Sequence, residues 1–430
     1  MDEGSSARIS ANLSKKVVTV VDCGIFPDVA ITIAPSFGTT YFWSPWQSAF
    51  PSSSKVLPGD GFDSIERVRW LWKAIEKSDL VVFPDVYFGD MQDFLSKQGV
   101  PVWGAKRGEM FELDRVGAKR IIKDAGLPVG NFEVCHGIKE LRAYLKENEN
   151  VWVKVSCNRG DAETYHSQRY DLIKPRIDEL EHRLGAKGSI AEFIVEDSID
   201  GDDVVEFGYD GFNIDGQWPV RSFFGVERKD EGFKGRVIEY ADFPHVLKKP
   251  NDALSPYFKE KQYRGFYSSE LRVTDKDTAY LIDPCCRAAS PPHEIYMEVF
   301  DNWGEIMWEG AHGRLAEPNT VHKFGVCAMI HCSWATKNWL PLRYPDSIRQ
   351  FVKLRYHCRI AGVDYFVPQP DSDLPEIGAV IGLGNTMEEA EEHLRENAAQ
   401  IDAYQIEIKL GCLEDATEEI EKAKKFGIEV

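Results

Sequence analysis

The chain has 430 residues, 43% hydrophobic and 28% charged, the balance of a globular protein with two or three domains. Its formal net charge of −19, without an offsetting basic run, argues against broad binding to nucleic acid or to an anionic membrane. No apolar run approaches the roughly 20 residues of a membrane span, and the N-terminus lacks the apolar core of a signal peptide. The nine cysteines are scattered without a CxxC pair, which fits a reducing, cytoplasmic environment.

Continuous apolar strands alternate with helical patterns in the first part of the chain. Strands are predicted over residues 16–22, 79–84 and 100–104, and helices over residues 64–77 and 90–98. This alternation is typical of a parallel sheet that is covered on both faces. We therefore expect a short disordered tail over residues 1–14 and a Rossmann-like domain over residues 15–128.

Further along, two runs of β-forming residues flank a polar turn and predict a hairpin. The runs cover residues 266–274 and 278–282. If the turn is a two-residue loop, Thr274 pairs with Ala279. In the same register Glu270 lies directly opposite Asp283, with Cβ atoms roughly 4.5–5.5 Å apart.

Two facing carboxylates repel each other and destabilise a sheet. A cation between Glu270 and Asp283 would remove that cost, and hard carboxylate oxygens suit Mg²⁺. Side chains alternate along a strand, so Cys285 and Arg287 share this face if the chain stays extended. Such a face could hold metal ions and a phosphate together. The alternative interpretation is a solvated acidic face, with the register one residue off.

The hairpin resembles the metal-binding signature of the ATP-grasp superfamily, an acid at the end of one strand followed by acid-x-x-x-Arg at the end of the next. The glycinamide ribonucleotide synthetase branch has Glu-Phe-Asn-Cys-Arg, where this chain has Asp283-Pro-Cys-Cys-Arg287. The resemblance implies that Glu270 and Asp283 hold Mg²⁺ and that Arg287 is catalytic, stabilising phosphoryl oxygens. Cys285 replaces the family's metal-ligating Asn. Because a thiol suits Mg²⁺ poorly, either water takes this place or the metal is softer, with Mn²⁺ as an alternative.

The first domain resembles that of the same synthetases, notably in the run Gly-Val-Pro-Val-Trp-Gly-Ala over residues 99–105. One departure bears on the substrate. The family's first strand runs into a Gly-Gly-Arg-Glu-His turn associated with phosphoribosylamine, whereas this strand ends in Asp22-Cys23-Gly24. With fewer glycines, fewer backbone N–H groups can converge on a phosphate, so we expect a substrate other than phosphoribosylamine.

The resemblance also implies a nucleotide site. Arg115, and less strongly Lys119, stands on the helix from which the family reaches the nucleotide phosphates, and Lys154 matches a lysine of its Val-Val-Val-Lys-Pro strand. The run from Glu227 to Lys229 falls near a cationic run of the family. The residues expected to bind ATP are Arg115, Lys154, Arg159, Gly160, Glu196, Asp197, Ile199 and Asp203. The alternative interpretation, without the resemblance, is that the helix of Arg115 has a solvated basic face, that Lys154 is an exposed strand lysine and that the other residues lie in charged turns.

We therefore expect an α/β protein of the ATP-grasp fold. Its nucleotide-binding domain is expected over residues 129–323, and a small α+β domain over residues 324–430. The resemblance implies an ATP-dependent ligase that converts a carboxylate into an acylphosphate and joins it to an amine, releasing ADP and phosphate. The expected partners are a small-molecule carboxylate and amine, with ATP and Mg²⁺ as cofactors, and a homodimer is left open. The alternatives are an ATP-binding module of this fold without ligase turnover and a true glycinamide ribonucleotide synthetase.

Overall fold

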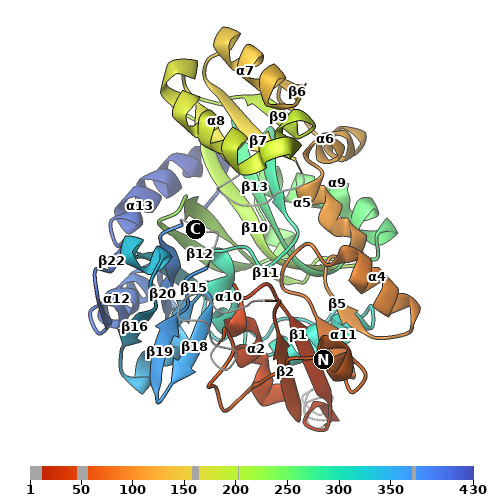
Figure 1. Ribbon diagram of the computed structural model, residues 1–430, viewed down its shortest axis with the longest axis vertical. Coiled ribbons are helices and arrows are strands. Elements are labelled where there is room, and N and C mark those ends of the chain that lie inside the picture. Colours follow the sequence, from red (N-terminus) through yellow and green to blue (C-terminus); the bar gives the residue numbers. More distant parts are fainter. Residues whose placement is uncertain (1–11, 46–56, 157–163, 202, 370–373) are drawn as a thin grey trace.

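The computed structural model describes residues 12–45, 57–156, 164–201, 203–369 and 374–430 (Figure 1). Most of the tail predicted over residues 1–14 lies outside these ranges, but Leu13 is buried in the core. In the described part of the chain, no helix has the length and apolar character needed to cross a bilayer.

The first part of the chain folds into the predicted parallel sheet, in the order β3-β2-β1-β4-β5. Its strands are β1 (Val17–Val21), β2 (Thr39–Trp43), β3 (Glu66–Arg67), β4 (Leu80–Val82) and β5 (Val102–Trp103). The helices beside it are α2 (Pro27–Ile33), α3 (Leu71–Ile75) and α4 (Gly89–Lys97), together with α11 (Trp303–Ala311) from much later in the chain. The apolar side chains of β1 and β4 are buried, as a sheet covered on both faces requires.

The helix predicted over residues 64–77 is wrong in its first half. The short strand β3 lies there, and helix α3 begins only at Leu71. The apolar spacing of this segment is helical, but Glu66 pairs with Tyr41 at the open edge of the sheet. Tertiary pairing therefore overrides the local periodicity.

A smaller antiparallel sheet with its own core lies at the top of Figure 1, in the order β6-β9-β7-β8. Its elements are β6 (Phe132–His136), α7 (Ile138–Glu147), β7 (Val151–Val155), β8 (Thr164–Ser167), α8 (Tyr170–Leu184) and β9 (Glu192–Asp197). Val151, Val153 and Val155 are buried in the core that this sheet forms with its helices. Lys154 therefore leaves β7 on the opposite side.

A nine-stranded sheet occupies the centre of the molecule. Its main path is β14-β13-β10-β11-β12-β15-β20-β17, and β22 pairs with β15. The strands are β10 (Val205–Ile214), β11 (Arg221–Arg228), β12 (Gly232–Glu239), β13 (Arg264–Val273), β14 (Ala279–Cys285), β15 (Phe324–His331), β17 (Val352–Leu354), β20 (Glu376–Gly384) and β22 (Glu407–Ile408). Because β12 pairs with β15, the sheet is continuous across the boundary expected between residues 323 and 324. The domain bounds themselves remain a prediction.

The rest of the chain completes the molecule around this sheet. A four-stranded sheet in the order β18-β19-β16-β21 lies near the C-terminus. Its strands are β16 (Leu340–Arg343), β18 (His357–Ile360), β19 (Val363–Phe366) and β21 (Asp402–Ala403). The remaining helices are α5 (Met110–Leu113), α6 (Arg115–Asp124), α9 (His245–Glu260), α10 (Pro292–Val299), α12 (Met387–Ala398) and α13 (Cys412–Ala423).

The register predicted beside the hairpin turn is wrong by one residue. Ala279 pairs with Val273 rather than with Thr274, and the N–H of Thr274 donates to the carbonyl of Thr278 at 3.1 Å. The turn is therefore longer than the two-residue loop that the sequence suggested, because the strands are held by their neighbours in the sheet and not by the turn alone.

The predicted pairing at the functional end of the hairpin is nevertheless confirmed. The register of the hairpin shifts by one residue further along β14, where Ile282 is an extra residue that forms a β-bulge. Beyond the bulge Glu270 pairs with Asp283, as predicted. The bulge thus compensates for the longer turn and returns both carboxylates to one face of the sheet.

Candidate active site

A cavity opens between the large sheet, the loop after β1 and the C-terminal strands. Strands β10, β13 and β14 form one wall. Other walls come from segments far apart in the chain, among them Phe26 after β1 and Tyr356 between β17 and β18. The charged residues that line the cavity are Glu112, Arg115, Glu206, Asp210, Glu227, Lys229, Asp230, Glu270, Asp283, Arg287, Arg355 and Glu376.

Two rows of side chains cross the strands on the cavity face. Residues in register on neighbouring strands point to the same side of a sheet. The Glu270 row consists of Gly208, Glu270 and Asp283. The Asp210 row, two residues further along the strands, consists of Asp210, Ser268 and Cys285. Both rows line the cavity, so the two expected metal ligands lie side by side at its wall.

The two carboxylates of the Glu270 row differ in their electrostatics. Burial raises the pKa of Glu270 well above its usual value, and the charges of Asp283 and Glu206 raise it further. Burial also acts to raise the pKa of Asp283, but Arg115 and Lys154 outweigh it and bring this pKa down to about 2. Asp283 is therefore ionised, whereas the cations nearby do not fully compensate an ionised Glu270.

Arg115 reaches the Glu270 row from the first turn of α6. Asp114 caps this helix, because its side chain accepts a hydrogen bond from the N–H of Gly117 at 2.8 Å. The buried guanidinium of Arg115 forms an ion pair with Asp283. The structure thus joins a residue expected to bind phosphate to a residue expected to bind metal.

Lys154 reaches the same place from the small sheet. Its Nζ donates a hydrogen bond to the carbonyl of Ile282, the bulge residue, at 2.5 Å. The same Nζ lies 3.5 Å from a carboxylate oxygen of Glu196, whose other oxygen pairs with Lys119 Nζ at 2.6 Å. All three charged side chains are nearly buried. Glu196 is one of the residues expected to bind ATP, and its side chain holds these two lysines in place.

The other described residues that were expected to bind the nucleotide do not line the cavity. Asp197 is exposed and accepts a hydrogen bond from Asn131 Nδ2 at 3.0 Å, while the carbonyl of Ile199 accepts one from Arg272 at 3.1 Å. Asp203 does not line the cavity and forms an exposed ion pair with Lys425. Arg159 and Gly160 lie outside the described residues.

Arg287 is held by an acid that the sequence reasoning missed. Glu112 of α5 is 2% exposed. Its two carboxylate oxygens accept hydrogen bonds from Arg287 Nε at 3.0 Å and from the backbone N–H of Cys286 at 2.7 Å. The sequence offers a weak signal for this contact, a single acid between Phe111 and Leu113, both of which are buried.

Cys285 and Lys229 also reach the cavity. Burial raises the pKa of the Cys285 thiol well above its usual value, so the thiol stays protonated and is a poor metal ligand. The charge of Lys229 lowers the pKa of both Glu270 and Asp283. Of the charged run in which the family has cations, Lys229 therefore acts on the Glu270 row.

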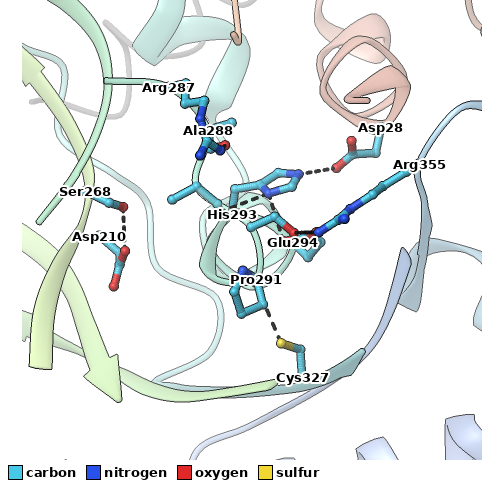
Figure 2. A network of polar contacts seen from close by, with 12 residues as sticks. Asp28, Asp210, Ser268, Arg287, Ala288, Pro291, His293, Glu294, Cys327 and Arg355 are labelled. Atoms are coloured by element: carbon cyan, nitrogen blue, oxygen red, sulfur yellow. Dashed lines mark hydrogen bonds and ion pairs between the residues drawn. The ribbon is translucent and has the colours of Figure 1, made fainter. Parts of the chain in front are cut away.

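A buried polar network borders the opposite side of the cavity (Figure 2). Arg355 donates to Glu376 at 2.7 Å and to the hydroxyl of Ser290 at 2.9 Å, and this hydroxyl donates to Glu294 at 2.6 Å. Glu294 also pairs with His293 at 2.8 Å. Burial acts to lower the pKa of His293, but its two acidic neighbours raise it to about 9. No local sequence pattern pointed to this network, because it joins segments far apart in the chain.

Neither a protein-family model nor a curated protein sequence matches the chain. Solved structures do match. Phosphoribosylamine–glycine ligase from Thermotoga maritima has a TM-score of 0.65 and 17% identity, over 92% of this chain and 99% of that one. The biotin carboxylase domain of 2-oxoglutarate carboxylase from Hydrogenobacter thermophilus has a TM-score of 0.66 and 12% identity, over 96% and 99%.

A third similar structure is N5-carboxyaminoimidazole ribonucleotide synthetase from Thermotoga maritima, with a TM-score of 0.56 and 13% identity over 90% of this chain and 99% of that one. These proteins belong to the ATP-grasp family. The chain has the ATP-grasp fold, as the hairpin resemblance implied. At these identities the likeness establishes the fold, and the chemistry has to be argued from the cavity.

Proposed function

We propose that the chain is an ATP-dependent, ADP-forming ligase that activates a carboxylate as an acylphosphate and joins it to an amine. The observation that carries this proposal is the Glu270 row. Two carboxylates lie side by side at a cavity wall, with Arg115, Lys154 and Lys229 directed at them. Cations and paired acids gathered in one cavity suit the transfer of a phosphoryl group, which needs charge neutralisation and alignment more than a protein nucleophile.

The donor set of the Glu270 row fits Mg²⁺, with Mn²⁺ as an alternative. Oxygen ligands are what Mg²⁺ prefers, and the high pKa of Glu270 shows that the row is short of positive charge. Cys285, one row away, keeps its proton and leaves the metal to Glu270 and Asp283. When bound, Mg²⁺ would neutralise the phosphates of ATP and keep them aligned. The similar biotin carboxylase domain was solved with MgADP and bicarbonate.

The remaining charged residues have distinct roles in this proposal. Arg115 and Lys154 contact the phosphates of ATP, and the segment from Glu196 to Ile199 receives the adenine. Arg287, fixed by Glu112, offers its remaining N–H donors to the acylphosphate oxygens. The reaction then needs two substrates, because the carboxylate oxygen attacks the γ-phosphorus and the amine nitrogen attacks the acyl carbon.

The loop after β1 supports a substrate other than phosphoribosylamine. The Asp22 side chain accepts hydrogen bonds from the N–H groups of Gly24 at 2.8 Å and Phe26 at 2.9 Å. These backbone donors are therefore occupied by a carboxylate and do not converge on a phosphate. This arrangement favours a ligase with another substrate over a true glycinamide ribonucleotide synthetase.

The proposal is tested by trapping the acylphosphate. The protein is mixed with ATP, Mg²⁺ and hydroxylamine, together with one member at a time of a panel of amino acids and other small carboxylic acids. We expect one carboxylate to give ADP and a hydroxamate in equal amounts, with no product from Asp283→Asn. Asp215→Asn, the same change at a site outside the cavity, is the matched control. ATP binding by calorimetry without ADP release from any carboxylate would favour an ATP-binding module.

A further inference from the structure

We propose that the Asp210 row is the binding site for the amine substrate, and that Asp210 accepts a proton from its nitrogen before the acylphosphate is attacked. This inference rests on the proposed ligase function and adds to it the acceptor site and its base.

The position of Asp210 suits the acceptor. Asp210 and Ser268 pair across β10 and β13, two residues beyond the pairing of Gly208 with Glu270. At 3.3–3.4 Å per residue the two rows are ~7 Å apart along the strands. A substrate on the Asp210 row would therefore lie beside the phosphoryl group that is held at the Glu270 row, inside the same cavity.

The charge of Asp210 points to a cationic ligand. Its side chain is buried, with 4% exposure, and accepts a hydrogen bond from the hydroxyl of Ser268 (Figure 2). Within the described part of the chain it forms no ion pair, whereas buried carboxylates are ordinarily paired with a cation. An ammonium group of a substrate would supply the missing charge.

The groups that face Asp210 from the packed elements are neutral. They are Ser268 on β13, Phe223 on β11, the thiol of Cys285 on β14 and the phenol of Tyr296 on α10, beside Tyr209 on its own strand. The next charged groups on this face are the two acids of the Glu270 row, followed by Glu206, which is already paired with Arg272. Across the cavity, Arg355 is already paired with Glu376. This end of the cavity therefore favours a positively charged amine over an anionic acceptor.

The proposed step balances in protons and charge. The ammonium nitrogen gives one proton to the Asp210 carboxylate, and its freed electron pair forms the bond to the acyl carbon. The bond from that carbon to the phosphate oxygen breaks, and its electron pair stays with the phosphate. A second proton from nitrogen leaves with the phosphate, and the third remains on the amide. No oxidant or reductant is needed.

This role requires Asp210 to be ionised. Burial raises the pKa of Asp210, and the hydrogen bond from Ser268 lowers it by a smaller amount. The resulting pKa is about 7. Amide formation should therefore increase as the pH rises through about 7. Hydroxylamine is largely uncharged at that pH and needs no base, so hydroxamate formation should lack this dependence.

The test compares two acceptors with one carboxylate, the one that the hydroxylamine trap identifies. In Asp210→Asn we expect amide formation with an amine to fall about 10²-fold or more, while hydroxamate formation changes by less than about threefold. The pH dependence near neutrality should disappear. Asp215→Asn should keep the wild-type ratio of amide to hydroxamate. Equal losses of both products in Asp210→Asn, or no loss of amide, would overturn the proposal.

A second variant tests the proposal even if Asp210→Asn does not fold. Ser268→Ala removes the hydrogen bond that lowers the pKa of Asp210. The increase of the amide-forming rate with pH should therefore occur at higher pH than in the wild-type protein. An increase at the same pH as in the wild-type protein would contradict the proposal.

A third measurement separates failure of this inference from failure of the ligase proposal. If wild-type protein gives no hydroxamate with any carboxylate, the ligase proposal fails independently of Asp210. Amine binding is then measured by carbon-13 NMR of aspartate labelled at its carboxyl carbon, with propylammonium as the probe. A bound ammonium should lower the pKa of Asp210, whereas an unchanged pKa would overturn the assignment of an amine site.

Discussion

Glu270 and Asp283 share one row but contribute to stability with opposite signs. The pKa of Glu270 is higher in the folded protein than its ordinary value. The free energy of unfolding therefore falls as the pH rises from the ordinary pKa to the raised pKa. The pKa of Asp283 is lowered to about 2, so its contribution is present at neutral pH and lost only in strong acid. In the proposed function, a bound cation beside Glu270 offsets this unfavourable acid.

Glu270→Gln should therefore stabilise the metal-free protein. In the presence of a chelator at about pH 7, we expect the free energy of unfolding to rise by about 1 kcal/mol, since the variant removes an acid whose ionised form is disfavoured by burial and by Asp283. The gain should disappear near pH 4, where Glu270 is protonated in both the folded and unfolded states. Thermal or urea unfolding measures both values. A loss of stability at neutral pH would mean that Glu270 is already compensated by its neighbours.

Asp283→Asn should have the opposite effect. Removing this carboxylate leaves the buried guanidinium of Arg115 without its partner, and breaking such a pair costs about 3 kcal/mol. Glu206→Gln is the control, because it breaks a partly exposed pair with Arg272 and should cost less than about 1 kcal/mol. Similar unfolding midpoints for the two variants would contradict the electrostatic description of the row.

Metal binding should depend on pH through Glu270. A protonated Glu270 must lose its proton to hold a cation, so affinity rises with pH. We expect the thermal stabilisation by Mg²⁺ and ADP to grow as the pH rises above the ordinary titration range of a glutamate in the wild-type protein, and to be nearly flat in Glu270→Gln. Equal pH profiles for the two proteins would exclude Glu270 as a ligand.

The chemistry of individual residues was predictable only where it is local. Asp283 and Cys285 could be placed on one face from strand alternation, and Glu270 was added to that face by the predicted hairpin pairing. The contact of Arg287 with Glu112 could not, because it joins two segments more than a hundred residues apart, and no periodicity records such a pairing. The sequence also placed Asp203 at the nucleotide, whereas its described partner is Lys425 near the C-terminus.

At the level of elements, the β-bulge of β14 sets the geometry of the site. If β14 continued past Leu281 without a bulge, Ile282 would pair with Glu270 and Asp283 would lie on the opposite face of the sheet. The bulge also presents the Ile282 carbonyl that Lys154 binds. The pairing of the two acids was predicted correctly although two details were missed. The loop is one residue longer than predicted, and the unpredicted bulge residue shifts the register back by one residue.

Deleting Ile282 should remove the bulge and keep Asp283 opposite Glu270. We expect the deletion variant to keep the metal-dependent part of ATP binding in calorimetry, because Asp283 then follows Leu281 directly and pairs with Glu270 in the regular register. Deleting Asp277 in the turn is the control and should be tolerated, since the register is held by β10 and the bulge. Loss of this binding in the Ile282 deletion variant would contradict the described register, because Asp283 should remain opposite Glu270.

On the scale of the whole molecule, one core joins segments from both ends of the chain. Val18 of β1, Phe223 of β11 and Ile381 of β20 belong to the same buried cluster, and β15 extends the sheet from β12. The sequence predicted the classes of element and their order. It could not show that the sheet continues across residues 323 and 324, because strand pairing over such distances leaves no local trace.

A chain truncated after residue 323 should therefore not fold as a stable unit. It would expose the edge of β12 and the apolar surface that β15 and β20 cover, so we expect aggregation or rapid proteolysis of the fragment. Solubility and limited proteolysis measure this. A soluble fragment with a cooperative unfolding transition would show that the C-terminal strands are a separate domain.

The central claim is that the Glu270 row serves an ATP-dependent ligase, and carboxylate-dependent ADP release with hydroxylamine tests it most directly. The account predicts that wild-type protein with Mg²⁺ releases ADP with a matching amount of hydroxamate for one carboxylate of the panel. Glu270→Gln and Asp283→Asn should release none, and Asp215→Asn should behave as wild type. ADP release that does not depend on a carboxylate, or that survives in both variants of the Glu270 row, would contradict the account.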